Sequence, residues 1–265
     1  MTNWKDAIGL NNHAVALLAG GGAANDGAII QCLQEAVALL QRAIQGESDN
    51  HLFPSQRVEN ETYSANKSTV QRIQCFEDPD FLLFDQAFLI LEEDDDSRLR
   101  LFCNDRDRDA WIELQSSIVL FNLALTFHRR ALLRSQYEQQ HPQNCDTLFR
   151  QNSYVFFSKS KLLYTMSNNI LLEHGGNCAR TNNDLFQSTK FALRLAIANN
   201  MAHIAVISEP RQEDDVSPTN QVAQLIEEGV PKKATMILPF AILSGIIMNI
   251  TCHNQKLPNR LASAA

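Results

Sequence analysis

The chain has 265 residues, of which 45% are hydrophobic and 20% are charged, and its formal net charge is −7. The apolar content suffices for a sizeable core and excludes a wholly disordered chain, and the acidic balance argues against a nucleic-acid-binding protein. The charge is distributed unevenly. Residues 77–109 hold twelve acids and four arginines, whereas residues 129–161 hold six bases and two acids.

Helical periodicity predicts two helices near the N-terminus. Residues 3–19 are apolar at helical spacing and stop at the glycines 20–22. A second helix follows Asn25, which can cap it. Its predicted apolar face consists of Ile29, Leu33, Val37, Leu40 and Ile44.

Residues 46–104 are predicted to be a polar linker, 46–67, followed by an acidic, Phe-rich insertion. Its stretch Asp80–Leu91 is too apolar to remain in water. It is interpreted either as an extended segment laid across helices or as a short helix. Acidic residues mixed with aromatic ones are also typical of disordered activation segments.

Three long helices are predicted next, over residues 106–138, 146–173 and 184–207. In the first, the inward residues are Trp111, Leu114, Ile118, Phe121 and Leu125. In the second, they are Leu148, Val155, Leu162, Met166 and Ile170. In the third, they are Phe186, Leu193, Ile197, Asn200 and Ile204. The prediction is a single all-α domain over residues 1–265.

After an acidic loop over 208–219, a short helix is predicted near 220–228 and an apolar terminal helix over 234–251. Residues 234–252 carry no formal charge and just suffice to span a bilayer as a tail anchor. Pro239 and the polar residues within this stretch favour a buried helix over a membrane anchor. Six scattered cysteines without a C-x-x-C pair indicate a reducing compartment, the cytoplasm or the nucleus.

Two short patterns recur among the predicted helices. An Asn, one residue, then Ala occurs at Asn12, Asn122 and Asn200. A small residue, a bulky one and a second small one recur in Ala36-x3-Leu40-x2-Ala43 and Ser153-x3-Phe157-x2-Ser160. Small residues let paired helices approach, and the bulky residue fills the space between them.

These patterns resemble the tetratricopeptide repeat (TPR), a helix-turn-helix unit of about 34 residues. The segment Leu120–Phe127 matches best, with Asn122, Ala124 and Phe127 at the family's Asn, small and aromatic positions. The wider layout is similar to TPR-like proteins abundant in diatoms, through the segments Asp80–Leu91, Val119–Leu125 and Leu261–Ala265. The resemblance implies an antiparallel array of about three helix pairs, with an extended insertion and a protein-binding groove.

No enzymatic motif is found. The chain lacks G-x-S-x-G, H-E-x-x-H and a Walker lysine. Asp105-x-Asp107-x-Asp109 begins like a calcium-binding loop, but Ala110 replaces the glycine that such a loop requires. The pairs His141/Cys145 and His174/Cys178 do not match zinc-site spacing. We therefore expect no catalytic residues, no metal and no cofactor.

The predicted function is a non-enzymatic scaffold that binds a protein or peptide along the groove. An all-α enzyme of unrecognised type and a tail-anchored membrane adaptor are the alternatives. The partner-binding candidates are Asn11, Phe121, His128, Arg129, Arg130, Arg134, Asn199 and His203. In chaperone-binding relatives, a further asparagine forms a carboxylate clamp. The matching positions here are Val15, Leu125 and His203, so no such clamp is expected.

The basic residues among these candidates suggest an acidic peptide as partner, although a solvated helix face is the alternative. The acidic insertion precedes the basic stretch, which raises the hypothesis that the insertion covers the groove as a built-in ligand. In the competing interpretation, its Phe side chains are simply part of the core. Deleting residues 77–96 distinguishes the two, because the first predicts stronger binding of acidic partners with helix content retained.

Overall fold

The computed structural model describes residues 2–20, 25–45, 87–90, 105–141, 147–173 and 184–208. They form the helices α1 (Thr2–Ala19), α2 (Asp26–Gln45), α4 (Asp105–Gln140), α5 (Thr147–Glu173) and α6 (Asp184–Ser208). This part of the chain contains no strand, which confirms the all-α prediction for it. The predicted linker over 46–67, the helices near 220–228 and 234–251, and most of the insertion lie outside the described residues. The predicted loop over 208–219 also lies outside them, except for Ser208, which is the last residue of α6.

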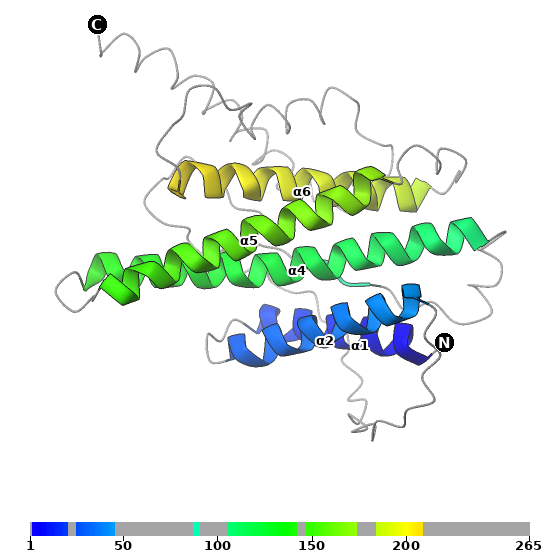
Figure 1. The fold of residues 1–265 in the computed structure, drawn as a ribbon, viewed down its shortest axis with the longest axis horizontal. Helices are drawn as coiled ribbons and strands as arrows, with labels where there is room; N and C mark the ends of the chain where they lie inside the picture. Colours follow the sequence, from blue (N-terminus) through cyan, green and yellow to red (C-terminus); the bar gives the residue numbers. More distant parts are fainter. Residues whose placement is uncertain are drawn as a thin grey trace, which may run out of the picture.

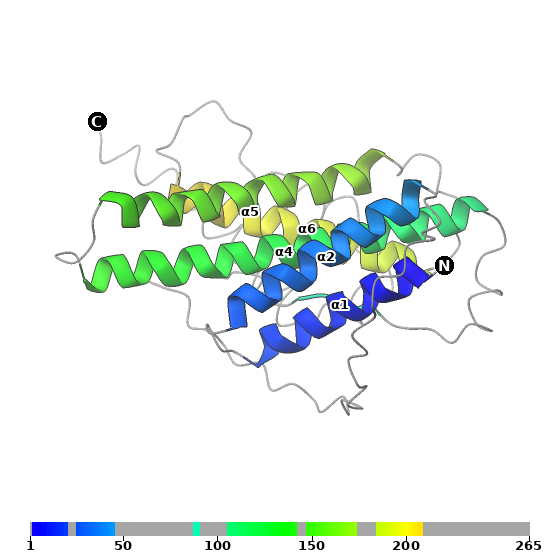
Figure 2. The same ribbon diagram turned by 60° about the horizontal axis from the view of Figure 1, so that its bottom comes forward.

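The five described helices form two antiparallel pairs and one further helix, α6 (Figures 1 and 2). Helix α1 packs against α2, and α4 packs against α5. The second pair stacks on the first through α2 and α4, and α6 lies against both α4 and α5. Helix α4 therefore occupies the centre of the structure and contacts all four of the other helices.

The central position of α4 explains its sequence. Every residue from Leu114 to His128 is buried, the polar residues included, and a helix that is buried on all sides is typical of the centre of a protein core. Among the described residues, one stretch, Asp109–Glu138 of α4, is long and apolar enough to cross a membrane. Since 83% of its most apolar window is buried within the protein, packing against the other helices accounts for this composition.

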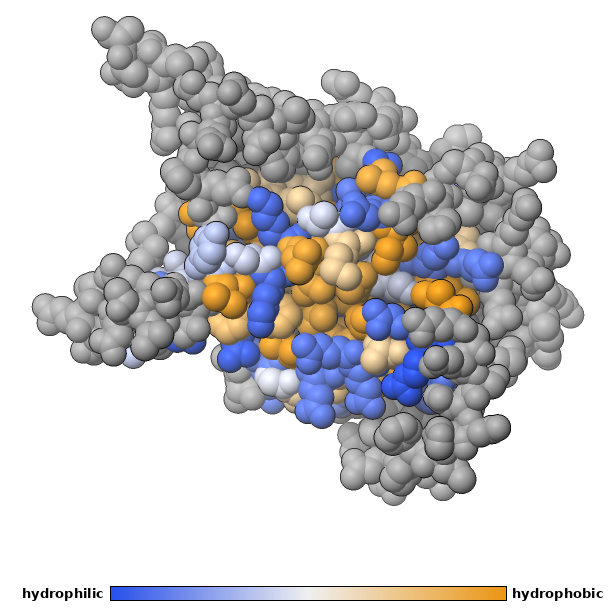
Figure 3. All heavy atoms as spheres, viewed as in Figure 1, coloured by the Kyte–Doolittle hydropathy of each residue, from blue (hydrophilic) through white to orange (hydrophobic). Residues whose placement is uncertain are grey.

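The predicted inward face of α5 is wrong at three of its five positions, whereas Ile170 is half-buried and the side chain of Leu148 lies outside the described residues. Val155, Leu162 and Met166 are 42%, 61% and 42% exposed, and Figure 3 shows apolar and polar side chains mixed on the face that α5 crosses. The buried face instead continues the small-bulky-small pattern. It consists of Ser153, Phe157, Ser160, Tyr164, Ser167 and Leu171.

Hydrogen bonds explain why serines, rather than the longer apolar residues, face α4. The Ser160 hydroxyl donates to the carbonyl oxygen of Ala124 at 2.8 Å. Ser117 and Ser167 each donate to the other's carbonyl oxygen, at 3.1 and 2.8 Å. Small hydroxyl side chains allow the helices to approach and satisfy their own polar atoms there.

We expect Ser160→Ala to lower the free energy of unfolding by about 1 kcal/mol, because it deletes a buried hydrogen bond between α4 and α5. Ser158→Ala, at an exposed position on the same helix, should have almost no effect. Urea denaturation followed by circular dichroism measures both. Equal effects of the two substitutions would contradict this orientation of α5.

The other predicted helix faces agree better with the structure. All five predicted residues of α6 are buried, as are four of the five in α4, where Trp111 is half-buried. In α2, Ile29, Leu33 and Leu40 are buried, whereas Ile44, next to the end of the helix, is exposed. The alanines of the Asn-x-Ala pattern are buried in all three helices that carry it. They are Ala14, Ala124 and Ala202.

Candidate functional site

A short segment, residues 87–90, lies between α1 and α4 and is drawn in teal in Figure 2. It forms neither helix nor strand. Leu89 is 59% exposed, whereas the next residue, Ile90, is 5% exposed. This alternation is typical of an extended chain, in which successive side chains point to opposite sides. For these four residues, the structure agrees with the extended rather than the helical interpretation of the insertion.

Two asparagine side chains each make a pair of hydrogen bonds with the backbone of this segment. The Asn122 side-chain oxygen accepts a hydrogen bond from the Phe88 N–H at 2.9 Å, and its amide nitrogen donates to the Phe88 carbonyl at 2.9 Å. Asn12 makes the same pair with Ile90, at 3.0 and 2.7 Å. Each asparagine thus replaces the neighbouring strand that an extended chain would otherwise pair with.

Asn11 joins these two asparagines into one network. Its side-chain oxygen accepts from Asn122 at 2.8 Å, and its amide nitrogen donates to the Phe88 carbonyl at 3.3 Å and to Asn12 at 3.2 Å. We call Asn11, Asn12 and Asn122 the asparagine cluster. Since Asn11 and Asn122 are fully buried, losing the segment would expose or unpair their polar atoms, which is costly.

Aromatic contacts give the site its apolar part. The Phe88 ring lies edge-on to the Phe121 ring, with 5.3 Å between centroids and 80° between planes. Phe121 also contacts Tyr164, at 5.5 Å between centroids. Asparagine contacts to backbone atoms are independent of sequence, whereas these ring contacts select a side chain.

A second buried polar group lies between α4 and α6. The His128 Nε2 and His203 Nδ1 atoms are 3.1 Å apart, and no described residue hydrogen-bonds the His128 Nδ1. Burial, and to a lesser extent His203, hold the pKa of His128 well below its ordinary value of 6.5. Nearby, Asn200 donates to the Tyr164 hydroxyl at 2.9 Å, and burial raises the pKa of Tyr164.

The histidine pair predicts acid-sensitive stability. Because the folded-state pKa of His128 is depressed, the unfolded chain takes up a proton below about pH 6.5 that the folded chain does not. The free energy of unfolding should therefore fall by about 2 kcal/mol at this site between pH 7 and pH 5. Urea denaturation at both pH values should show a smaller fall for His128→Gln. The exposed-site control, His13→Gln, should match the unaltered chain, and an equal fall in all three proteins would contradict the assignment.

The predicted basic residues of α4 contact the chain itself. Arg129 donates to the Leu18 carbonyl at the end of α1, at 3.3 Å, and Arg130 lies over the Phe156 ring, 4.8 Å from its centroid. Burial raises the pKa of Asp26, at the start of α2, and the charges of Arg130 and Arg129 oppose this rise. Arg134 is half-buried further along α4.

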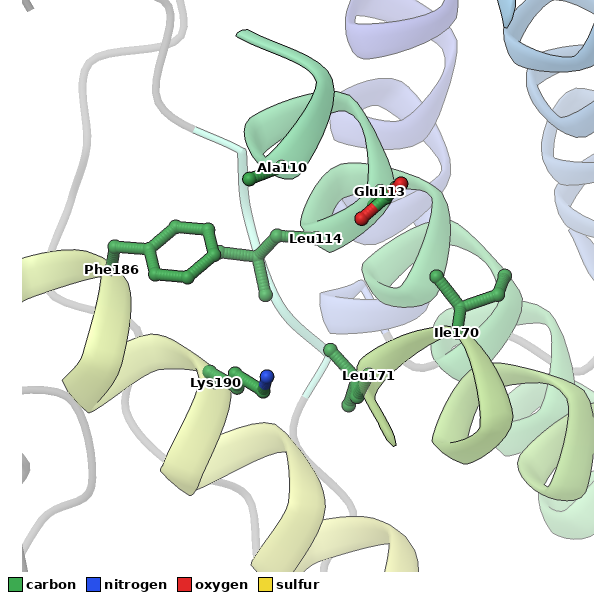
Figure 4. Close-up of a pocket in the computed structure, with 7 residues that line it drawn as sticks. All are labelled: Ala110, Glu113, Leu114, Ile170, Leu171, Phe186 and Lys190. Carbon is green, nitrogen blue, oxygen red and sulfur yellow. The ribbon is translucent and has the colours of Figure 1, made fainter. Parts of the chain in front are cut away.

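A small hollow lies between α4, α5 and α6. Its lining consists of Ala110, Glu113, Leu114, Ile170, Leu171, Phe186 and Lys190 (Figure 4). Its volume of about 10 Å³ has room for about one water molecule, which is too little for a substrate. Within the described ranges, no three His, Cys, Asp or Glu side chains are placed to hold a metal ion.

The predicted partner-binding residues thus fall into three groups. Asn11 and Phe121 belong to the site around residues 87–90. His128, Asn199 and His203 are buried in the interior. The three arginines lie along the second half of α4.

Sequence reasoning missed Asn12 and Asn122 as binding residues, because it attributed them to helix packing. The Asn-x-Ala pattern shared by α1 and α4 marks both positions, although it does not show what the two side chains bind.

Comparisons of the chain with protein-family models, with curated proteins and with solved structures gave no match.

Proposed function

We propose that this protein is a TPR-like, non-enzymatic scaffold that binds an extended peptide of a partner protein. The binding site in this proposal is the asparagine cluster together with the Phe121 ring. The observation that carries the proposal is the double pairing of Asn122 with the backbone of Phe88 and of Asn12 with the backbone of Ile90. Such pairing fits an extended chain of any sequence, because it uses only N–H and C=O groups.

The position of these residues supports a repeat-protein scaffold. Asn12 and Asn122 occupy the same place of the Asn-x-Ala pattern, on the first helix of two successive antiparallel pairs. Helical-repeat proteins present first-helix side chains along one surface, and a chain lying across them contacts several repeats at once. A peptide held by both α1 and α4 fits that mode of binding.

Selection from a display library tests the proposal. Random 12-residue peptides displayed on phage are selected on the full chain carrying Phe88→Ala/Ile90→Ala, which removes the two apolar side chains that hold residues 87–90 in the site. The asparagine substitutions are made in this same chain. We expect enriched peptides that lose most of their binding to Asn12→Ala/Asn122→Ala. They should keep it on Asn169→Ala, which removes an exposed asparagine of α5. No enrichment, or enriched peptides that bind all three proteins equally, would overturn the proposal.

A further inference from the structure

The side chains of residues 88–90 indicate which peptides the site accepts. Phe88 packs on the buried Phe121 ring, and Ile90 is buried within the main core cluster. Leu89, between them, points to solvent although it is equally apolar. The site therefore selects the first and third positions and leaves the second free.

We infer that residues 87–90 occupy the partner's own binding position, and that the partner carries the same pattern. That pattern is a large aromatic residue, any residue, then a branched aliphatic residue, in an extended conformation. This inference rests on the proposed function and adds the class of peptide and its regulation. The chain then carries a competitor for its own binding site.

The hydrogen bonds make it feasible for a partner's peptide to replace residues 87–90 in the site. Every hydrogen bond between the asparagine cluster and this segment involves a backbone N–H or C=O group of Phe88 or Ile90. A partner with the same spacing offers the same four groups, so the buried asparagines are paired both before and after the exchange. The two apolar contacts are equally reproduced by an aromatic and an aliphatic side chain. Exchange thus replaces each contact with its equivalent.

Covalent attachment lets the internal segment compete effectively with a free peptide for the site. Residues 46–86 and 91–104 connect it to α2 and α4. A tethered ligand acts at an effective concentration on the order of millimolar. A free peptide of equal intrinsic affinity must therefore compete with it, and the unaltered chain should bind partners weakly until the segment is displaced.

The first experiment weakens the binding of the internal segment to the site and supplies the same sequence as a free peptide. The probe is a fluorescent peptide with the sequence of residues Phe84–Glu93, and fluorescence anisotropy measures its binding. Phe88→Ala/Ile90→Ala in the full chain should bind it at least about tenfold more tightly than the unaltered chain. Adding Asn122→Ala should abolish this gain, and the matched variant Leu89→Ala should bind like the unaltered chain.

Variants of the peptide test the pattern. A peptide carrying Leu89→Lys should bind as well as the original, because that side chain is exposed. A peptide carrying Phe88→Lys should lose its binding, because a lysine cannot pack edge-on to Phe121. Equal binding of both altered peptides would overturn the stated specificity.

Hydrogen exchange provides a readout on the unaltered chain, which does not depend on how any variant folds. The N–H groups of Phe88 and Ile90 should exchange slowly, and excess peptide should speed their exchange, because Asn122 and Asn12 then pair with the incoming chain. The inference would be overturned if excess peptide left the exchange of these two N–H groups unchanged and if the unaltered chain and the Phe88→Ala/Ile90→Ala chain bound the peptide with equal affinity.

The outcomes also separate this inference from the proposed function. If library-selected peptides bind through the asparagines but the Phe84–Glu93 peptide does not, the inference fails and the proposed function stands. If neither kind of peptide binds, both fail.

Discussion

Phe121→Ala is expected to lower the free energy of unfolding by about 4 kcal/mol. Phe121 lies at the centre of α4, is fully buried, and contacts the rings of both Phe88 and Tyr164. Its removal leaves a cavity where α4, α5 and the 87–90 segment meet. Because the serine contacts already hold α4 close to α5, the helices have little freedom to close that cavity.

Leu162→Ala is the matched control, because Leu162 is large, apolar and helical but exposed. It should change the free energy of unfolding by less than about 0.5 kcal/mol. Urea denaturation of both variants, fitted with a common slope, measures the difference. A loss below about 1 kcal/mol for Phe121→Ala, or a comparable loss for Leu162→Ala, would contradict the described core.

Asn122→Ala is expected to cost about 3 kcal/mol of stability, the second largest effect. The substitution removes the acceptor of the Phe88 N–H, a donor to the Phe88 carbonyl and a donor to Asn11. Several buried polar groups lose a partner at once, which costs more than the net value of one hydrogen bond. Hydrogen exchange at residues 87–90 should accelerate in the same variant.

The control for this substitution is Asn169→Ala, at an exposed position of α5. Denaturation should show no loss above about 0.5 kcal/mol for it. An Asn122→Ala protein as stable as this control would mean that α4 does not hold the segment through Asn122.

Much of the helical architecture could be predicted from sequence, because α1, α2, α4, α5 and α6 are long and have strong start and stop signals. The predicted limits of the second long helix, 146–173, differ from α5 (Thr147–Glu173) by one residue at its start. The buried face of α5 could not be predicted from apolar spacing, since its inward residues include serines that a hydrophobic pattern counts as polar. The small-bulky-small pattern identified that face correctly, because small residues are needed where two helices pack closely.

The candidate site was only partly predictable. Asn11 and Phe121 were singled out as partner-binding residues, and both contact the 87–90 segment. The pairing of Asn12 and Asn122 with its backbone could not be read from sequence, because backbone groups carry no sequence signal and the partners are 78 and 34 residues apart. The charge pattern instead favoured Arg129, Arg130 and Arg134 as binding residues. Uncharged amide groups supply the contacts to the segment described above.

In the proposed function, the asparagine cluster binds an extended peptide through the peptide's backbone. A crystal structure of the Phe88→Ala/Ile90→Ala chain bound to the Phe84–Glu93 peptide would show this binding mode. We expect the peptide to lie between α1 and α4, with the N–H groups of its Phe and Ile donating to Asn122 and Asn12. A peptide bound elsewhere, or bound between these helices without those asparagine contacts, would contradict it.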